Sequence, residues 1–291
     1  MKYIKKLFGG IDLTWKKLLI FSVTAGIIPG ILLSIPALKD TSFTDNGSSY
    51  EWWVFFAIII ISNCKKPLEA ACKTFVFFLI TQPLIYLVQV PFCWLHWGIF
   101  SYYPPWFFQT LLTFPGAFLG WYVKKGKWYS LLILLPMLWL LSETAMAYLH
   151  GLLYMPPRHL LTTIFCAVQV FVLVIAFFED KKLCIAGCIL GAGLLTFCFF
   201  MNIYHQPMGS INVYGEEIDP DMHYTAESSD ESIVRITEDE LVQPNGMQAE
   251  FYHKGSAEVT FTADDGTVLV YKAWLGDDYD MGLEFVEKRG K

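Results

Sequence analysis

The feature that most constrains this chain is a series of seven long apolar runs. A helix that crosses a bilayer needs about 20 predominantly apolar residues, and its backbone polar groups must be satisfied within the helix. The composition agrees, because 55% of the residues are hydrophobic and only 16% are charged, which excludes a water-soluble globule. The sequence therefore predicts an all-α membrane bundle of seven transmembrane helices, at Leu18–Leu38, Tyr50–Cys64, Phe75–Phe92, Trp106–Val123, Trp128–Ala147, Leu160–Phe178 and Leu183–Tyr204.

The first two runs each leave an alternative open. The first follows a basic leader, as a signal peptide does, but it is longer than the apolar core of a signal peptide, so we expect an uncleaved helix. The second, Tyr50–Cys64, covers about 23 Å at the helical rise. It must extend through Ser48 and Ser49, thin the bilayer locally, or enter and leave the membrane on one side.

The distribution of lysine and arginine predicts the orientation, because cytoplasmic loops retain positive charge during insertion. With seven crossings, the loops between helices on one side of the membrane hold only Lys39 and Arg158. We therefore expect the N-terminus in the cytoplasm and the C-terminus outside. The opposite side carries thirteen lysines: Lys2, Lys5, Lys6, Lys16, Lys17, Lys65, Lys66, Lys73, Lys124, Lys125, Lys127, Lys181 and Lys182.

Five polar side chains inside the predicted helices form a candidate intramembrane site. Ionisable and amide side chains are costly in hydrocarbon and usually face the interior of a bundle. Glu143 is the one carboxylate that we place in the apolar body of a helix, and the helical rise puts it at the depth of Gln89 and Gln109. Gln82 and Gln169 are expected near the midplane.

Four side chains on the outer side could form the rim of a pocket with Glu143 at its floor. One interpretation is such an outward-facing pocket for a solute. The other, which we favour, is a hydrogen-bonded packing network between helices, with the loop histidines solvated. The four rim candidates are His96, His150, Arg158 and His159.

The sequence contains no recognisable catalytic pattern. Intramembrane hydrolysis needs a nucleophile with a base, paired carboxylates or a metal set within hydrogen-bond reach. The sequence has no G-x-S-x-G motif, no H-E-x-x-H motif and no second acid that we can pair with Glu143. A metal site of His96, His150, His159 and Glu143 is chemically possible, but their spacing does not force them together. We therefore expect neither enzymatic activity nor a cofactor.

Three of the predicted helices carry glycine pairs at four-residue spacing. Small residues let helix backbones approach closely in a membrane. In a chain with seven helices we expect these pairs to serve internal packing rather than dimerisation. The pairs are Gly26 and Gly30, Gly116 and Gly120, and Gly187 and Gly191.

The C-terminal part of the chain has the opposite charge from the rest. Residues 204–291 hold 6 Lys and Arg against 19 Asp and Glu, whereas residues 1–203 hold 15 against 8. We interpret residues 205–231 as an acidic linker and residues 232–291 as a small antiparallel β domain outside the cell. Asp264-Asp265-Gly266 predicts a hairpin. The expected strands are Ser232–Thr237, Gln248–Lys254, Ala257–Ala263, Thr267–Leu275 and Gly282–Glu287.

The turn before the last predicted strand is a weak candidate for calcium. Asp277, Asp278 and Asp280 supply the oxygen ligands that calcium prefers. Their spacing is not that of an EF-hand loop, and acidic turns are ordinary in soluble sheets. We therefore predict no metal here.

These features predict a non-enzymatic multi-pass protein of a bacterial-type cytoplasmic membrane whose external β domain binds or senses something at the cell envelope. The expected partners are the lipid bilayer and an envelope protein or small solute. Nucleic acid is excluded, because no soluble stretch is basic. The alternative is a transporter or solute-binding membrane subunit with an outward-facing polar pocket around Glu143.

Overall fold

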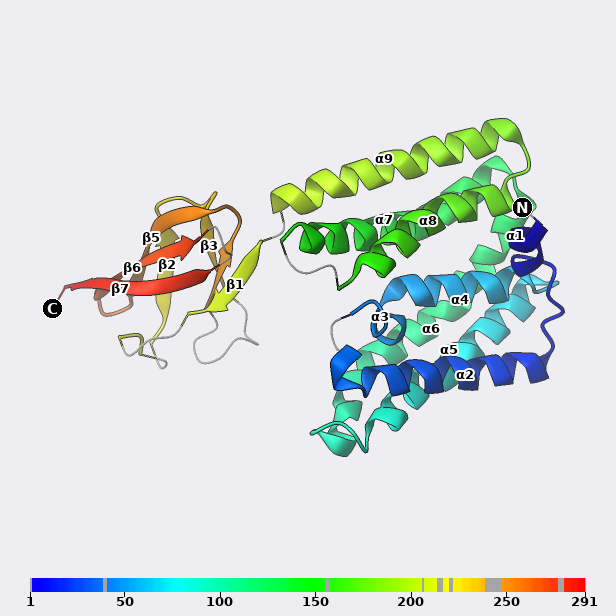
Figure 1. Cartoon of the computed structure of the whole chain (residues 1–291), viewed down its shortest axis with the longest axis horizontal. Coiled ribbons are helices and arrows are strands. Elements are labelled where there is room, and N and C mark those ends of the chain that lie inside the picture. The colour runs from blue at the N-terminus through cyan, green and yellow to red at the C-terminus, as the bar shows by residue number, and fades with distance from the viewer. Residues whose placement is uncertain are drawn as a thin grey trace. The chain divides into compact units, whose positions relative to one another are not determined.

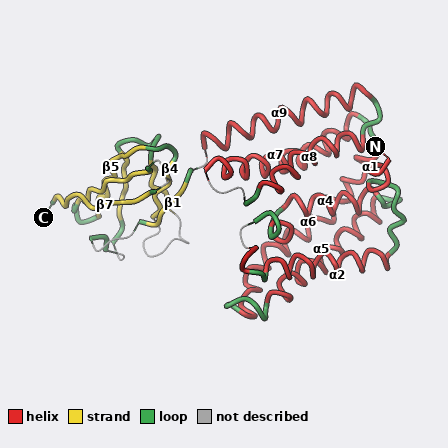
Figure 2. Tube along the Cα trace, in the orientation of Figure 1, coloured by secondary structure: helices red, strands yellow, loops and turns green. Residues whose placement is uncertain are grey.

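The computed structural model describes residues 2–38, 41–154, 158–205, 207–213, 217–219, 222–238, 247–276 and 280–290. The chain divides into two compact units, Met1–Phe199 and Phe200–Lys291. The first is helical and the second is built from strands (Figures 1 and 2). The helical elements are α1 (Lys2–Leu7), α2 (Trp15–Leu33), η1 (Pro36–Leu38), α3 (Asp45–Ser48), α4 (Tyr50–Ser62), α5 (Pro67–Gln89), η2 (His96–Tyr102), α6 (Tyr103–Gly120), η3 (Trp121–Lys125), α7 (Trp128–Tyr154), α8 (Leu160–Phe177) and α9 (Lys181–His205).

The helical unit is a bundle in which successive long helices reverse direction (Figure 1). Helix α5 packs against α2 and α6, α7 packs against α8, and α4 lies between these groups, in contact with α5 and α7. An aromatic core joins α2, α4 and α5, because the ring of Phe77 contacts Phe21, Phe56 and Phe78 at centroid distances of 4.9, 5.8 and 5.2 Å. The bundle therefore has a packed interior of its own.

Five helices in the described part of the chain are long and apolar enough to cross a membrane: α2, α5, α7, α8 and α9. The other two predicted crossings, α4 and α6, are helices that do not have the length and apolar composition that a crossing needs. Helix α4 has only 13 residues, because the backbone at Ser49 is extended and delays the start of the helix to Tyr50. Helix α6 has 18 residues but includes two prolines in its first turn and Pro115 within it, as well as Gln109, Thr110 and Thr113. The structure thus supports five candidate crossings directly, rather than seven.

Two of the three glycine pairs pack helices together, as predicted. A Cβ at Gly26 would lie 2.7 Å from the Cβ of Leu84, and one at Gly30 would lie 2.8 Å from the Cβ of Val88, so α2 and α5 approach closely. A Cβ at Gly187 or Gly191 of α9 would lie 2.7 Å from a Cγ1 atom of Val174 or Val170, so side chains of α8 pack directly onto these glycines. In the third pair, a Cβ at Gly120 would meet Ile61 at 3.3 Å, but one at Gly116 would meet no heavy atom within 4 Å. Gly116 therefore borders open space.

The basic segments of the sequence meet at one end of the bundle. Lys5 Nζ lies 2.7 Å from a carboxylate oxygen of Glu179, which joins the N-terminal segment to the α8–α9 connection. The backbone N–H of Ile11 donates to Asn63 at 2.7 Å. Lys124 Nζ donates to the backbone carbonyl of Cys64 at 2.7 Å, which joins the α6–α7 connection to the end of α4. The positive charge is thus concentrated where these connections lie side by side.

The second unit consists of two antiparallel sheets, with strand orders β1-β4-β3 and β2-β5-β6-β7. Both sheets contribute to one hydrophobic core, in which Val234, Phe251 and Phe261 are fully buried. The predicted hairpin is confirmed, since β5 and β6 pair across a turn in which Gly266 has a φ of +85°. The strands are β1 (Gly209–Asn212), β2 (Tyr224–Ser228), β3 (Val234–Glu238), β4 (Met247–Phe251), β5 (Gly255–Ala263), β6 (Val268–Leu275) and β7 (Met281–Arg289).

The five predicted strands correspond to β3–β7, but the expected linker contains two further strands. Strand β1 pairs with β4, and β2 pairs with β5, so residues 205–231 contribute to both sheets. Both strands are short, and β2 alternates buried and exposed residues over only five positions. Strands β1 and β2 form because they pair with β4 and β5, which are distant in the sequence. Local composition does not indicate such pairing.

Candidate functional site

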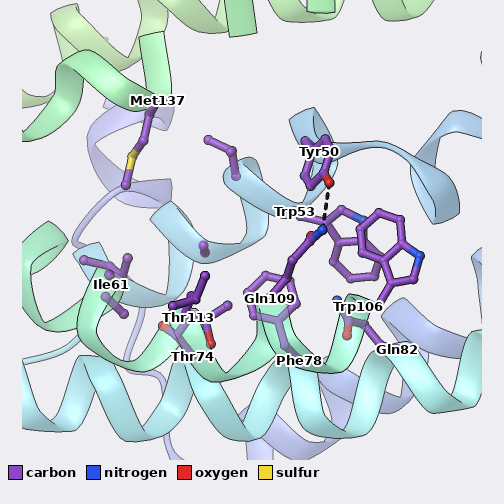
Figure 3. A pocket seen from close by; sticks show the side chains of 15 residues that line it. Tyr50, Trp53, Ile61, Thr74, Phe78, Gln82, Trp106, Gln109, Thr113 and Met137 are labelled. Carbon is purple, nitrogen blue, oxygen red and sulfur yellow. Dashed lines mark hydrogen bonds between the residues drawn. The ribbon is translucent and has the colours of Figure 1, made fainter. Parts of the chain in front are cut away.

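A cavity of about 260 Å³ lies within the helical unit (Figure 3). We call it the α4–α6 cavity, because α4, α5 and α6 supply all its lining except Met137 of α7. No lining residue is charged, and the walls are largely aromatic and aliphatic. The lining residues are Tyr50, Trp53, Val54, Ala57, Ile61, Thr74, Phe78, Gln82, Trp106, Gln109, Leu112, Thr113, Gly116, Ala117 and Met137.

Two polar atoms in the wall of this cavity are buried without a hydrogen-bond partner. They are the indole Nε1 of Trp53 and the hydroxyl of Thr74. Their residues are 6% and 1% exposed. A buried polar group without a partner costs free energy, and orphaned groups of this kind are rare in folded proteins. Both atoms are enclosed in the wall, and a rotation of either side chain would be needed to present its polar group to a molecule in the cavity.

The amide side chains in this region are held by the helices around them. Gln109 Nε2 donates to the hydroxyl of Tyr50 at 2.8 Å, a contact visible in Figure 3. Gln82 Oε1 accepts from the hydroxyl of Thr110 at 2.6 Å. These bonds fix both amides at the cavity wall and connect α4 to α6 and α5 to α6.

The other three residues of the candidate intramembrane site lie elsewhere. Gln89 Nε2 donates to the backbone carbonyl of Ile85, within its own helix, at 3.0 Å. Glu143 on α7 interacts with the thiol of Cys198 on α9. The side-chain amide of Gln169 on α8 lies 3.5 Å from the backbone carbonyl of Glu51. The structure thus brings Gln82 and Gln109 together at one cavity, and Glu143, Gln89 and Gln169 are not among its lining residues.

The four rim candidates are in different surroundings. His96 is exposed in η2 and has a φ of +47°. His150 is 7% exposed on α7. Arg158 has an exposed side chain, and its backbone carbonyl accepts from the backbone N–H of Ser42 at 2.9 Å. His159 Nδ1 lies 3.0 Å from Asp45 Oδ2, and its ring stacks on Tyr148 with a centroid distance of 4.8 Å.

His159 belongs to a buried polar group that the sequence did not indicate. We call it the Asp45–Glu51 cluster, and its residues come from α3, the Ser49 linker, α4, the residue before α8, and α8 itself. Glu51 is fully buried and accepts a hydrogen bond from the hydroxyl of Ser49. Our prediction had placed Glu143 as the one carboxylate in the apolar body of a helix, although Glu51 also falls within a predicted run. The members of the cluster are Asp45, Ser49, Glu51, His159, Thr162 and Gln169.

The described residues give little support to the two metal sites considered in the sequence analysis, a site of histidines with Glu143 and a calcium site in the turn before the last strand. Among them, no group of three or more His, Cys, Asp and Glu side chains could hold a metal ion. Of the calcium candidates, Asp277 and Asp278 lie outside the described residues. Asp280 is exposed, and its backbone carbonyl accepts from the N–H of Gly276 at 2.7 Å.

Comparison of the chain with protein-family profiles, curated proteins and solved structures finds no match. The functional argument therefore rests on the geometry of the α4–α6 cavity and of the Asp45–Glu51 cluster.

Proposed function

We propose that this chain is a multi-pass membrane protein that binds a small, uncharged and largely apolar molecule in the α4–α6 cavity. The observation that carries this proposal is the combination of an apolar cavity with two buried, unpartnered polar groups, Trp53 Nε1 and Thr74 Oγ1. Ligand sites are typically concave, mostly apolar and supplied with a few polar groups that fix orientation. This cavity, rather than the surroundings of Glu143, is the proposed pocket, because Glu143 does not line it.

The lining indicates the chemistry of the ligand. The indole N–H of Trp53 can only donate, so the ligand needs a hydrogen-bond acceptor at that point. The hydroxyl of Thr74 can donate or accept. The rings of Tyr50, Phe78 and Trp106 suit an aromatic or aliphatic body, and the lack of a charged lining residue disfavours an ionic ligand.

The proposed membrane topology has seven crossings, with the N-terminus inside and the β unit outside. The lysine-rich connections at one end of the bundle support this orientation. Helices α4 and α6 pack against α5 and α7, two of the five candidate crossings, which supports their crossing the membrane as well (Figure 1). We further propose that the acidic β unit serves contacts at the envelope of a bacterial-type cell, because its charge favours solvent over an anionic lipid surface.

Filling the cavity tests the proposed function. Gly116 lines the cavity, and a Cβ there would meet no heavy atom within 4 Å, so Gly116→Leu adds volume without a backbone clash. Binding can be measured by the protein-dependent emission of 1-aminoanthracene, an uncharged fluorescent probe of apolar cavities, in detergent micelles. We expect the substitution to weaken probe binding by about tenfold or more, a loss of about 1.4 kcal/mol.

Gly193 provides the matched control, because a Cβ on this glycine of α9 also meets no heavy atom within 4 Å and Gly193 does not line the cavity. Gly193→Leu should bind the probe as the unmodified protein does. Equal binding by the Gly116→Leu and Gly193→Leu proteins would show that the cavity is not the binding site.

A further inference from the structure

The Asp45–Glu51 cluster surrounds a break between two helices. Helix α3 ends at Ser48, Ser49 is extended with φ −122° and ψ 152°, and α4 begins at Tyr50. In membrane transporters, interrupted helices place backbone and side-chain groups around bound ions. The break alone does not make a site, but it brings two buried carboxylates against α8, Asp45 at Thr162 and Glu51 at Gln169.

The carboxylate of Asp45 is well satisfied by its neighbours. Asp45 Oδ2 lies 3.0 Å from Nδ1 of His159 and accepts a hydrogen bond from the hydroxyl of Thr162. The ring of Tyr148, on α7, stacks on His159 at a centroid distance of 4.8 Å. Because His159 and Thr162 both contact Oδ2, the carboxylate of Asp45 already has two hydrogen-bonding partners.

Glu51 is different, because its carboxyl group has no cationic partner among the residues that the structure describes. It is fully buried, and no ion pair among the described residues includes it. Its Oε1 is hydrogen-bonded to the hydroxyl of Ser49, which shares its single proton between Glu51 and the backbone carbonyl of Asp45, and its Oε2 has no hydrogen-bond partner. An uncompensated buried carboxylate is strongly destabilising. The position of Glu51 in the first turn of α4 offsets only part of this cost, since a helix N-terminus carries about half a positive charge.

A second orphaned oxygen belongs to Gln169, whose side chain contacts the backbone of Glu51. Gln169 is 3% exposed, and its Oε1 has no partner, although its Nε2 lies 3.5 Å from the backbone carbonyl of Glu51. An amide oxygen cannot donate, so it cannot neutralise a carboxylate. It can, however, share a cation with one.

We propose that Glu51 Oε2 and Gln169 Oε1 bind a monovalent hard cation, with Na⁺ as the ion to be tested. The two atoms are buried oxygens with free lone pairs, which suit a hard cation rather than a soft metal. A single positive charge matches the site. Asp45 already has hydrogen-bonding partners, so only the negative charge of Glu51 remains to be neutralised. The other titratable groups that face the cluster are His159, Tyr148 on α7 and Cys166 on α8.

The test measures thermal unfolding of the full chain in detergent at pH 8, in NaCl, KCl or choline chloride at equal ionic strength. An ion that binds only the folded protein raises the unfolding temperature. We expect NaCl to raise it over choline chloride by roughly 3–6 °C when the ion is present at about ten times its dissociation constant. Glu51→Gln should abolish this increment, because the amide removes the charge that the ion neutralises.

Glu143→Gln is the matched control, since Glu143 is a carboxylate of the same bundle that contacts Cys198 and lies outside the cluster. This protein should keep the full response to Na⁺. Binding of radiolabelled Na⁺ to the unmodified protein supplies a second measurement that does not depend on the folding of any variant.

Two results would overturn the proposal. One is the absence of both an increment with NaCl and binding of radiolabelled Na⁺. The other is an equal increment in the Glu51→Gln protein. Stabilisation of the unmodified protein by acid in choline chloride, without any effect of Na⁺, would assign a proton to Glu51 in place of the cation. None of these results bears on probe binding in the α4–α6 cavity, so the two proposals fail separately.

Discussion

Replacing Gly26 with valine should prevent α2 and α5 from packing as they do in the native bundle. A Cβ at this position would lie 2.7 Å from the Cβ of Leu84 and 2.9 Å from the backbone oxygen of Thr81. The backbone oxygen cannot rotate away, so the helices must separate. Overpacking of this kind typically costs about 1–3 kcal/mol and sometimes more, and the loss of close backbone contact adds to it.

Thermal unfolding in detergent, followed by size-exclusion chromatography, measures this effect. A cost of about 1–3 kcal/mol corresponds to a decrease of roughly 2–12 °C in the unfolding temperature. Gly193→Val places the same side chain on α9, where a Cβ meets no heavy atom within 4 Å, and it should leave the unfolding temperature close to the native value. Equal stability of the two valine proteins would contradict the close packing of α2 on α5.

The β unit should be strongly destabilised when Phe261 is replaced with alanine. The side chain is fully buried, and its ring meets that of Tyr271 edge to face at a centroid distance of 5.5 Å. Removing a buried phenylalanine ring typically costs about 3–5 kcal/mol. The free energy of unfolding of a small domain is only about 5–15 kcal/mol, so this loss is a large fraction of it.

Limited proteolysis of the full chain reports on this unit. Cleavage within residues 200–291 should become much faster in the Phe261→Ala protein, while the helical unit is retained. Val286→Ala is the comparison, because Val286 is 52% exposed on β7 and its truncation opens no cavity. If both alanine proteins resist protease equally, Phe261 does not anchor the core.

The sequence was informative wherever a repeating pattern determines the structure. Each predicted apolar run coincides with a helix, and five of these helices are long and apolar enough to cross a membrane. The spacing of the glycines predicted the contacts of Gly26 and Gly187 with neighbouring helices. Alternation of apolar and polar residues located five strands of the β unit. Each of these patterns is local, so it can be read without knowing which elements are neighbours.

The sites depend on contacts between distant residues, and here the sequence was less informative. Asp45 and His159 are separated by 114 positions, and Glu51 meets Gln169 across a similar distance in the chain. The cavity arises because Trp53 of α4 and Thr74 of α5 line one space, which no spacing rule reveals. One signal was available, because Glu51 is a carboxylate inside the second apolar run and such residues are costly in membranes.

A topology with seven crossings and one with five place the connections between helices on different sides of the membrane. The side on which Lys66 lies distinguishes the two topologies. With seven crossings, the connection between α4 and α5 lies inside the cell. With five, α4 and α6 do not cross, and the same connection lies outside. The β unit lies outside in either case when the N-terminus is inside. Lys66 and Ser256 have exposed side chains, in the α4–α5 connection and on β5, so a cysteine at either position can react.

The most direct test is to label Lys66→Cys and Ser256→Cys proteins, in a background that lacks the native Cys93, with a membrane-impermeant thiol reagent on intact cells. We predict that the cysteine at position 256 is labelled and that the cysteine at position 66 is protected until the cells are lysed. Labelling of both positions would contradict the crossing of α4 and α6. Protection of position 256 would place the β unit in the cytoplasm and would contradict the proposed role at the envelope.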